Sequence, residues 1–115
     1  MKLTTNKLTG AALDWAVAKC TDLPFPIVYD EDGRKVLVSP STNWAQGGPI
    51  IEQERIEVRP YDEEKWIATD NVTNYQIGPT PLITAMRCHV AGQLGDEVDV
   101  PDSIALPDYE TEGEE

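Results

Sequence analysis

Histidine and cysteine are scarce in this chain, which limits the chemistry that it can perform. The 115 residues include one histidine, His89, and two cysteines, Cys20 and Cys88. Zinc sites need three or four such ligands, so a metal centre is not expected, and two distant cysteines do not form a disulfide framework. Cys88 and His89 are neighbours, but adjacent residues on a helix point about 100° apart and do not converge on one ion.

Long apolar runs are also missing. No stretch approaches the ~20 apolar residues that span a bilayer, and no apolar signal segment follows Met1–Thr5. We therefore expect a cytoplasmic protein without a membrane partner, and its length fits one domain of about 100–150 residues. So short a chain builds only a modest core, which self-association into a homo-oligomer would supplement.

Basic side chains are outnumbered by acidic ones, and the imbalance is uneven. Residues 1–95 carry twelve acidic and nine basic side chains, whereas residues 96–115 carry nine acidic and no basic ones. We expect a single domain over residues 1–101 and an acidic, flexible tail over residues 102–115. The acidity disfavours direct binding to duplex nucleic acid. An acidic mimic of DNA is the least favoured alternative function, because mimicry needs carboxylates held rigidly at phosphate spacing, which such a tail does not offer.

The pattern of apolar residues predicts a helix near each end of the domain. The first helix runs from about Thr9 to Lys19, with Leu13 and Val17 on its buried face and Asp14 in water. The last helix is capped by Thr80, starts with Pro81 and stops at Gly95. Its apolar stripe consists of Leu82, Met86, Val90 and Leu94.

Two hairpins are expected between these helices. Ile27–Tyr29 and Lys35–Val38 flank an Asp-Gly turn, and Ile56–Arg59 precedes Lys65–Thr69. The segment Ser39–Pro49, rich in small and turn-forming residues, is predicted to be a loop. The fold class is therefore α+β, with a small antiparallel sheet of about four strands in two hairpins packed with an N-terminal and a C-terminal helix.

The most distinctive candidate site is the segment Trp44–Glu52 inside and after that loop. The paired Gly47 and Gly48 would expose backbone N–H groups, Trp44 would stack on a planar group and Gln46 would supply an amide. These are the parts of a nucleotide site. The alternative is structural, because Gly-Gly-Pro is also an ordinary turn and Trp44 would plug one end of the core.

Two further residues belong to the same hypothesis. Thr80 begins the last helix, whose N-terminus attracts anions, and Arg87 would neutralise a phosphate. Lys65, Arg55 and Arg59 would join Arg87 if the fold gathers them. The alternative for Arg87 is a solvated or ion-paired side chain.

Familiar catalytic motifs are absent from the sequence. Gly47-Gly48 lacks the Gly-Lys-Ser/Thr ending of a phosphate-binding loop, and no dinucleotide fingerprint is present, so no cofactor is expected. Acid–base chemistry by the glutamates near the Gly-Gly pair stays formally open; these are Glu52, Glu54 and Glu57. We expect a protein that binds and does not catalyse.

Three blocks of the sequence resemble a known family. The NinX-like proteins of tailed bacteriophages and prophages are similar, in the same order, to Met1–Thr5 with Leu8–Val17, to Trp44–Glu52, and to Gly78–Ile83 through Ala85–Cys88 with Gly95–Val98. The resemblance covers about residues 1–101 and brings no catalytic residues. It implies a small accessory protein made in the infected host bacterium. By analogy, such a protein would counter host defence by sequestering a small nucleotide signal, or by acting as an inhibitor or adaptor of a host enzyme.

Overall fold

Four α-helices and three small antiparallel sheets make up the described part of the chain, residues 1–70 and 74–105 of a computed structural model. The helices are α1 (Gly10–Thr21), α2 (Trp44–Glu54), α3 (Pro81–Leu94) and α4 (Asp102–Ala105), and a 3₁₀ helix η1 covers Thr5–Lys7. The strands are β1 (Lys2–Thr4), β2 (Ile27–Tyr29), β3 (Lys35–Leu37), β4 (Glu57–Pro60), β5 (Trp66–Thr69), β6 (Tyr75–Gly78) and β7 (Glu97–Asp99). The predicted α+β class is confirmed.

Both predicted hairpins are present, and two further pairings join them. Strands β2 and β3 pair alone, whereas β4, β5 and β6 form one sheet in that order, with Ala68 of β5 between Val58 and Gln76. Strand β1 pairs with β7. Neither β6 nor the β1–β7 pair was predicted, because these segments show little periodicity and the partners β1 and β7 lie far apart in the sequence.

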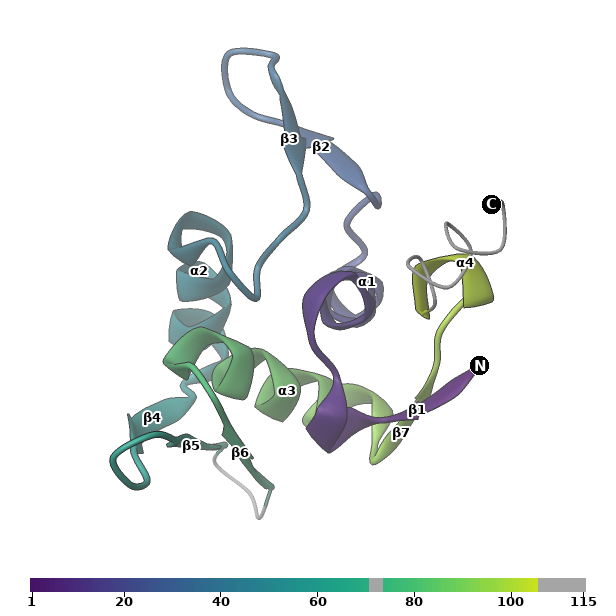
Figure 1. Cartoon of the computed structure of the whole chain (residues 1–115). Coiled ribbons are helices and arrows are strands. Elements are labelled where there is room, and N and C mark those ends of the chain that lie inside the picture. Colours follow the sequence, from purple (N-terminus) through teal and green to yellow (C-terminus); the bar gives the residue numbers. More distant parts are fainter. Residues whose placement is uncertain (71–73, 106–115) are drawn as a thin grey trace.

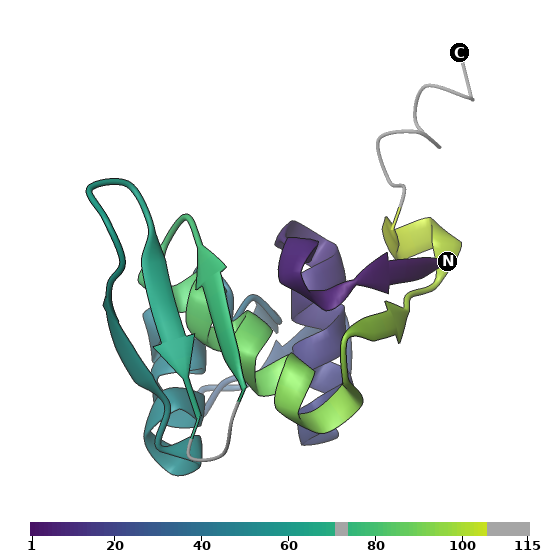
Figure 2. The ribbon, with the colours of Figure 1, turned by 90° about the horizontal axis from the view of Figure 1, so that it is seen from below.

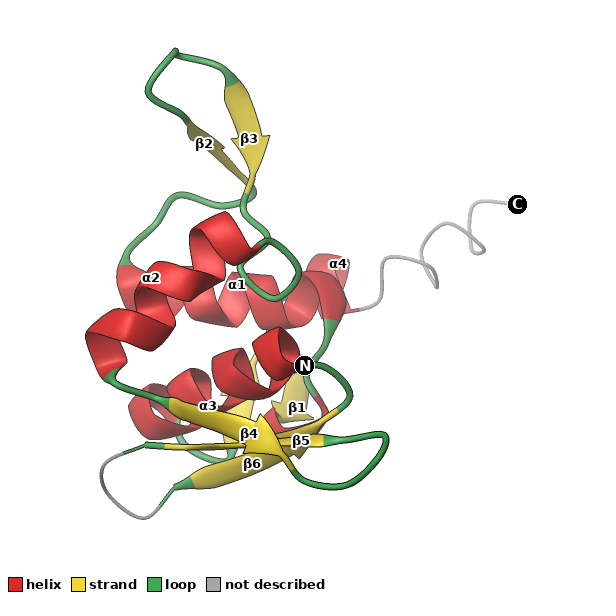
Figure 3. Ribbon diagram, turned by 90° about the vertical axis from the view of Figure 1, so that its left-hand side faces the viewer, coloured by secondary structure: helices red, strands yellow, loops and turns green. Residues whose placement is uncertain are grey.

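The long helix α3 lies at the centre of the layers. Figure 3 shows α3 between the three-stranded sheet and the helices α1 and α2, while the β2–β3 hairpin extends from the far side of α2. Figure 1 shows the same hairpin projecting at the top, well away from the sheet. The hairpin is therefore the part of the fold with the least support from the core.

Helix α3 has the ends that the sequence predicts. The Thr80 hydroxyl accepts a hydrogen bond from the Ile83 amide at 3.1 Å, Pro81 is the first helical residue, and Gly95 ends the helix with a φ of 92°. The predicted stripe is confirmed, since Leu82, Met86 and Val90 are buried and Leu94 packs against them. Polar residues of α3 are buried too, because elements surround the helix on most sides; these are Thr84, Arg87 and His89.

Helix α1 follows the prediction except at one residue. Leu13 and Val17 are buried as expected, but the prediction that Asp14 faces water was wrong. Its carboxylate accepts a hydrogen bond of 2.9 Å from the Ser41 amide, 27 residues away. Burial raises the pKa of Asp14, and the hydrogen bonds from Ser41 oppose this rise. The spacing of residues within the first helix could not show that the later segment at Ser41 would cover Asp14.

The predicted loop over Ser39–Pro49 was also wrong, because helix α2 begins inside it. Asn43 caps the helix by accepting a 2.9 Å hydrogen bond from the Ala45 amide. Gly47, Gly48 and Pro49 all lie within the helix. Their low helix propensity is overcome by packing, since Gly47 is buried against the Pro40 carbonyl and the Leu82 side chain.

The two ends of the domain are joined. The Met1 ammonium donates to the carbonyl of Val100 at 2.8 Å and pairs with Asp99 and Asp102 at 3.1 Å each. Figure 2 shows β1 and β7 side by side next to α1. Asp102–Ala105, the first residues of the predicted acidic tail, form α4 against α1. The rest of that predicted segment, residues 106–115, lies outside the described residues.

None of the described helices is long and apolar enough to cross a membrane.

Candidate functional site

Gln46 has a structural task at the base of the projecting hairpin. Its Oε1 accepts a hydrogen bond from the Ser39 amide at 2.7 Å, and its Nε2 donates to the Leu37 carbonyl at 2.8 Å. The main chain at the end of β3 and just after it therefore engages both ends of the amide. The contacts fix the hairpin to α2 and leave Gln46 little capacity for a ligand.

The predicted cradle of Gly47 and Gly48 is not formed. The Gly47 amide donates to the Asn43 carbonyl at 2.9 Å, and Gly48 follows inside the same helix, where backbone N–H groups bond to carbonyls four residues earlier. A Cβ atom added to Gly47 would lie 2.6 Å from Leu82 Cδ1 and closer still to the Pro40 carbonyl oxygen. The pair therefore serves helix packing and does not present donors to a phosphate.

Trp44 and Thr80 are brought together, as the nucleotide hypothesis requires. Both line a hollow of about 240 Å³ between the start of α2 and the start of α3, with Pro81 and Ile83. The Trp44 side chain is 57% exposed, so the alternative that it plugs the core was wrong. No charged side chain of the described residues lines this hollow. It suits a planar, uncharged group stacked on the indole.

Arg87 is neither solvated nor ion-paired among the described residues, so both parts of the structural alternative were wrong. It is 9% exposed, and its Nε donates to the Leu8 carbonyl at 2.7 Å while Nη1 donates to the Ile77 carbonyl at 3.2 Å. Burial lowers the pKa of Arg87, yet a guanidinium keeps its proton at neutral pH. A buried positive charge thus lies against two neutral carbonyls.

A second hollow contains this charge. It measures about 430 Å³ and is lined by Glu64, Lys65, Ile77, Gly78, Pro79 and Arg87. Gly78 permits the close approach, because a Cβ atom there would lie 3.1 Å from Arg87 Nη1 and 2.5 Å from Thr84 Oγ1. Lys65 adds a second cation and Glu64 adds one carboxylate, so cations outnumber carboxylates in the lining, whereas Arg55 and Arg59 do not line the hollow. The fold gathers two of the four basic residues that the sequence suggested.

The two hollows are neighbours, because consecutive residues of the chain line them. Gly78 and Pro79 line the cationic hollow, and Thr80 and Pro81 line the hollow beside Trp44. The segment Gly78–Pro81 therefore stands between an uncharged aromatic surface and two cationic side chains, at the N-terminus of α3. This arrangement combines three features that bind nucleotides: an aromatic ring, cations and a helix N-terminus.

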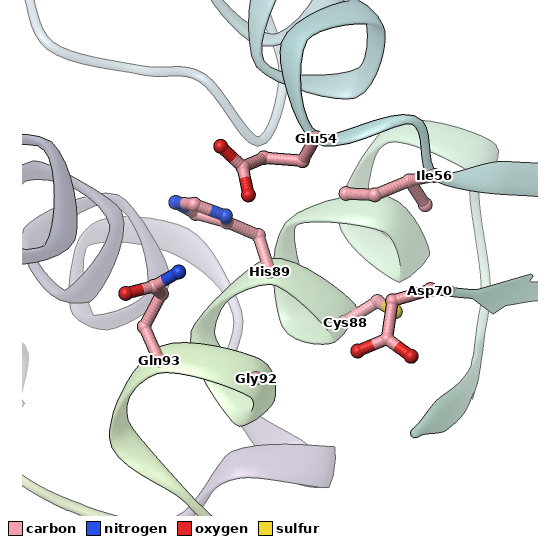
Figure 4. A pocket seen from close by; sticks show the side chains of 7 residues that line it. All are labelled: Glu54, Ile56, Asp70, Cys88, His89, Gly92 and Gln93. Carbon is pink, nitrogen blue, oxygen red and sulfur yellow. The ribbon is translucent and has the colours of Figure 1, made fainter. Parts of the chain in front are cut away.

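Histidine, cysteine and carboxylate side chains are the residues that build metal sites and thiolate nucleophiles. Among residues 1–70 and 74–105, no group of three of them is placed to hold a metal ion. Burial, together with the charge of Asp70, raises the pKa of the Cys88 thiol to about 12, so it is not a thiolate nucleophile at neutral pH. Cys88 and His89 border one hollow, but Figure 4 shows Cys88 beside Asp70 and His89 below Glu54.

The buried His89 makes stability depend on pH. Desolvation lowers its pKa below 6.5, although Glu54 opposes the shift. The unfolded chain therefore binds a proton at higher pH than the folded one, and we expect the free energy of unfolding to fall as the pH drops through 6.5. Urea unfolding between about pH 5.5 and 7.5 measures this slope. His89→Gln, which removes the only histidine, should flatten it, and an equal slope in both proteins would refute the assignment.

The described geometry thus consists of a packed α+β domain with two adjoining hollows at the start of α3. No curated protein matches the chain. A family model described as bacteriophage P22 NinX matches residues 4–93. The match includes α1, α2, the three-stranded sheet and all of α3 except Leu94, and with them both hollows. The chain therefore belongs to the bacteriophage P22 NinX family and is a phage accessory protein.

Proposed function

We propose that this phage accessory protein works without catalysis in the cytoplasm of the infected bacterium, where it binds and sequesters a small nucleotide signal. The observation that carries the proposal is the buried guanidinium of Arg87, which has no carboxylate partner among the described residues and lines a hollow of about 430 Å³ with Lys65. An anionic ligand would supply the missing counter-charge. The size lies within the ~300–1,000 Å³ of small-molecule sites.

Each part of a nucleotide has a counterpart around Gly78–Pro81. Phosphate groups would lie against Arg87 and Lys65, and a base would stack on the exposed ring of Trp44 beside Thr80. Gln46, Gly47 and Gly48 take no part in contacting the ligand, because packing and main-chain hydrogen bonds occupy them. They hold α2 in the position that presents Trp44.

Thermal unfolding tests the proposal. Cyclic nucleotides and ADP-ribose derivatives should include a ligand that raises the melting temperature by several degrees, because binding to the folded state alone stabilises it. Lys65→Ala and Trp44→Ala should each reduce the shift and leave the ligand-free melting temperature nearly unchanged, since both side chains are exposed. Lys35→Ala, on the remote hairpin, is the matched control. No shift across the panel, or full shifts in both site variants, would refute capture.

A second candidate function is protein binding, as an inhibitor or adaptor of a host enzyme. The β2–β3 hairpin projects from the domain, and one of its faces exposes Ile27, Tyr29 and Leu37, the last two by 65% and 66%. A two-stranded hairpin alone is only marginally stable in water, so a partner that covers this face would stabilise it. Apolar side chains that gather on a projecting element are typical of docking surfaces.

Pull-down from host lysate separates the two candidates. Protein binding predicts a stoichiometric host partner that is lost in Leu37→Ser and retained in Lys65→Ala. Nucleotide capture predicts a thermal shift that is lost in Lys65→Ala and retained in Leu37→Ser. Light scattering on the purified protein adds a third arm, because a concentration-dependent dimer lost in Leu37→Ser would assign the hairpin face to a second copy of the chain.

A further inference from the structure

A third hollow, at the C-terminal end of α3, is acidic, in contrast to the hollow of Arg87 and Lys65. It measures about 260 Å³ and is lined by Glu54 at the end of α2, Ile56, Asp70 after β5, and Cys88, His89, Gly92 and Gln93 of α3. Figure 4 shows these side chains, with the imidazole of His89 between the carboxylate of Glu54 and the amide of Gln93. His89 and Gln93 lie four residues apart and so share one face of the helix.

The imidazole in this hollow lacks a partner. His89 is 7% exposed, and its Nε2 is enclosed by protein without a hydrogen bond to the described residues. Buried polar atoms of folded proteins are nearly always paired, and an unpaired one lowers stability. Desolvation lowers the pKa of His89, so the ring is neutral at pH 7 and has one nitrogen that accepts a hydrogen bond.

The charges around the ring select the kind of ligand. Two carboxylates, Glu54 and Asp70, line the hollow, and among the described residues no lysine or arginine lines it. The Asp70 carboxylate accepts a hydrogen bond from the Asn74 amide at 3.2 Å, whereas Glu54 is in none of the ion pairs between described residues. Acceptors therefore dominate the site. Phosphate-bearing ligands are repelled from it, so it is separate in chemistry from the hollow of Arg87.

We propose that this hollow binds an organic cation with N–H donors, an alkylammonium or guanidinium group. Glu54 is its counter-ion. The neutral ring of His89 accepts a hydrogen bond through Nδ1, because Nε2 is enclosed by protein, and the exposed amide of Gln93 rotates to present its oxygen, which points away from the ring in Figure 4. The volume of about 260 Å³ admits such a head group on a short stem. The protonated thiol of Cys88 adds polarizable surface without charge. A free polyamine and an arginine or lysine side chain of another protein share this chemistry.

The single histidine gives a direct readout. The proton resonances of the His89 ring are followed by NMR in the full chain while methylguanidinium or ethylammonium is added at constant ionic strength and pH. We expect a saturable shift of these resonances. Tetramethylammonium carries the same charge but no N–H donor, so it should produce no saturable shift.

Matched variants assign the effect to Glu54. Glu54→Gln keeps the shape of the side chain and removes its charge, and it should weaken binding at least tenfold. Glu52→Gln, two residues earlier on α2 with an exposed side chain, should leave binding unchanged. Thermal unfolding of each variant verifies the fold. Equal shifts with tetramethylammonium, unchanged binding in Glu54→Gln, or no saturable shift at all would overturn the proposal.

Two further ligands identify the source of the cation. Tighter binding of spermidine than of methylguanidinium assigns the site to free polyamines. Tighter binding of an arginine-containing tripeptide assigns it to a side chain of a partner protein. Nucleotides should not bind in this hollow, so the Glu54→Gln variant should retain any thermal shift that nucleotides cause. The cation proposal can therefore be refuted without refuting nucleotide capture, and the reverse.

Discussion

Gly47→Ala is expected to lower the free energy of unfolding by roughly 2–3 kcal/mol, although alanine is the better helix former. The added Cβ atom would lie 2.6 Å from Leu82 Cδ1 and would collide with the main-chain oxygen of Pro40. A flexible side chain could move aside, but a carbonyl at the entry to α2 can move only if the chain before the helix moves with it. Urea unfolding followed by tryptophan fluorescence measures the change.

The neighbouring glycine provides the control. A Cβ atom on Gly48 would find its nearest atom, Trp44 Cε3, at 4.0 Å, which is ordinary contact. Gly48→Ala should therefore raise the free energy of unfolding by about 0.5–1 kcal/mol, through helix propensity alone. Opposite signs at adjacent positions would establish that the two glycines have different tasks. A gain in stability at both positions would show that packing of α2 against α3 is looser than described.

The sequence predicted those elements whose signals are local. Helix α3 carries a cap, an N-terminal proline and a C-terminal glycine within its own segment, and its ends were predicted to within a residue. The β2–β3 hairpin was predicted because Asp-Gly supplies its turn, where Gly33 has a φ of 79°. Such signals act between neighbours in the chain, so a single sequence displays them.

Elements that depend on distant contacts were missed. The pairing of β1 with β7 joins residues almost 100 positions apart, and no periodicity reports it. Helix α2 contains two glycines and a proline, which favour a turn by propensity. Its helical state depends on the fit of Gly47 to Pro40 and Leu82, two contacts from other parts of the chain. Tertiary packing overrode local preference here.

The same difference between local signals and distant contacts applies to the candidate site. Residue type nominated Trp44, Thr80 and Arg87 as ligand-binding residues, and the fold places each of them at the border of a hollow. The same reasoning assigned donors to Gly47 and an open amide to Gln46, which the fold uses for packing and for holding the hairpin. The acidic hollow of Glu54 and His89 was not predicted, because its lining comes from α2, the end of β5 and α3.

Arg87→Met is expected to lower the free energy of unfolding by about 3 kcal/mol. The guanidinium links α3 to the carbonyl of Leu8, after η1, and to the carbonyl of Ile77 in β6. Methionine fills much of the same volume but leaves these oxygens without a donor, and hydrogen bonds to charged groups contribute about 1.5–3 kcal/mol. Arg59→Met is the matched control, because Arg59 is exposed and its pair with Glu57 spans 3.9 Å; its change should stay within about 0.5 kcal/mol.

A gain in stability in Arg87→Met would change the interpretation of this arginine. A buried charge without a counter-ion is unfavourable, and replacing it by an apolar side chain of similar size has stabilised other proteins by about 1–4 kcal/mol. If Arg87→Met unfolds at higher urea concentration than the unmodified chain, the structural role is wrong. The guanidinium would then be retained at the expense of stability, as binding residues are. Whichever way its stability changes, the Arg87→Met variant should lose the thermal shift caused by nucleotides if Arg87 binds phosphate as proposed. A weaker fold whose shift persists would assign Arg87 a purely structural role.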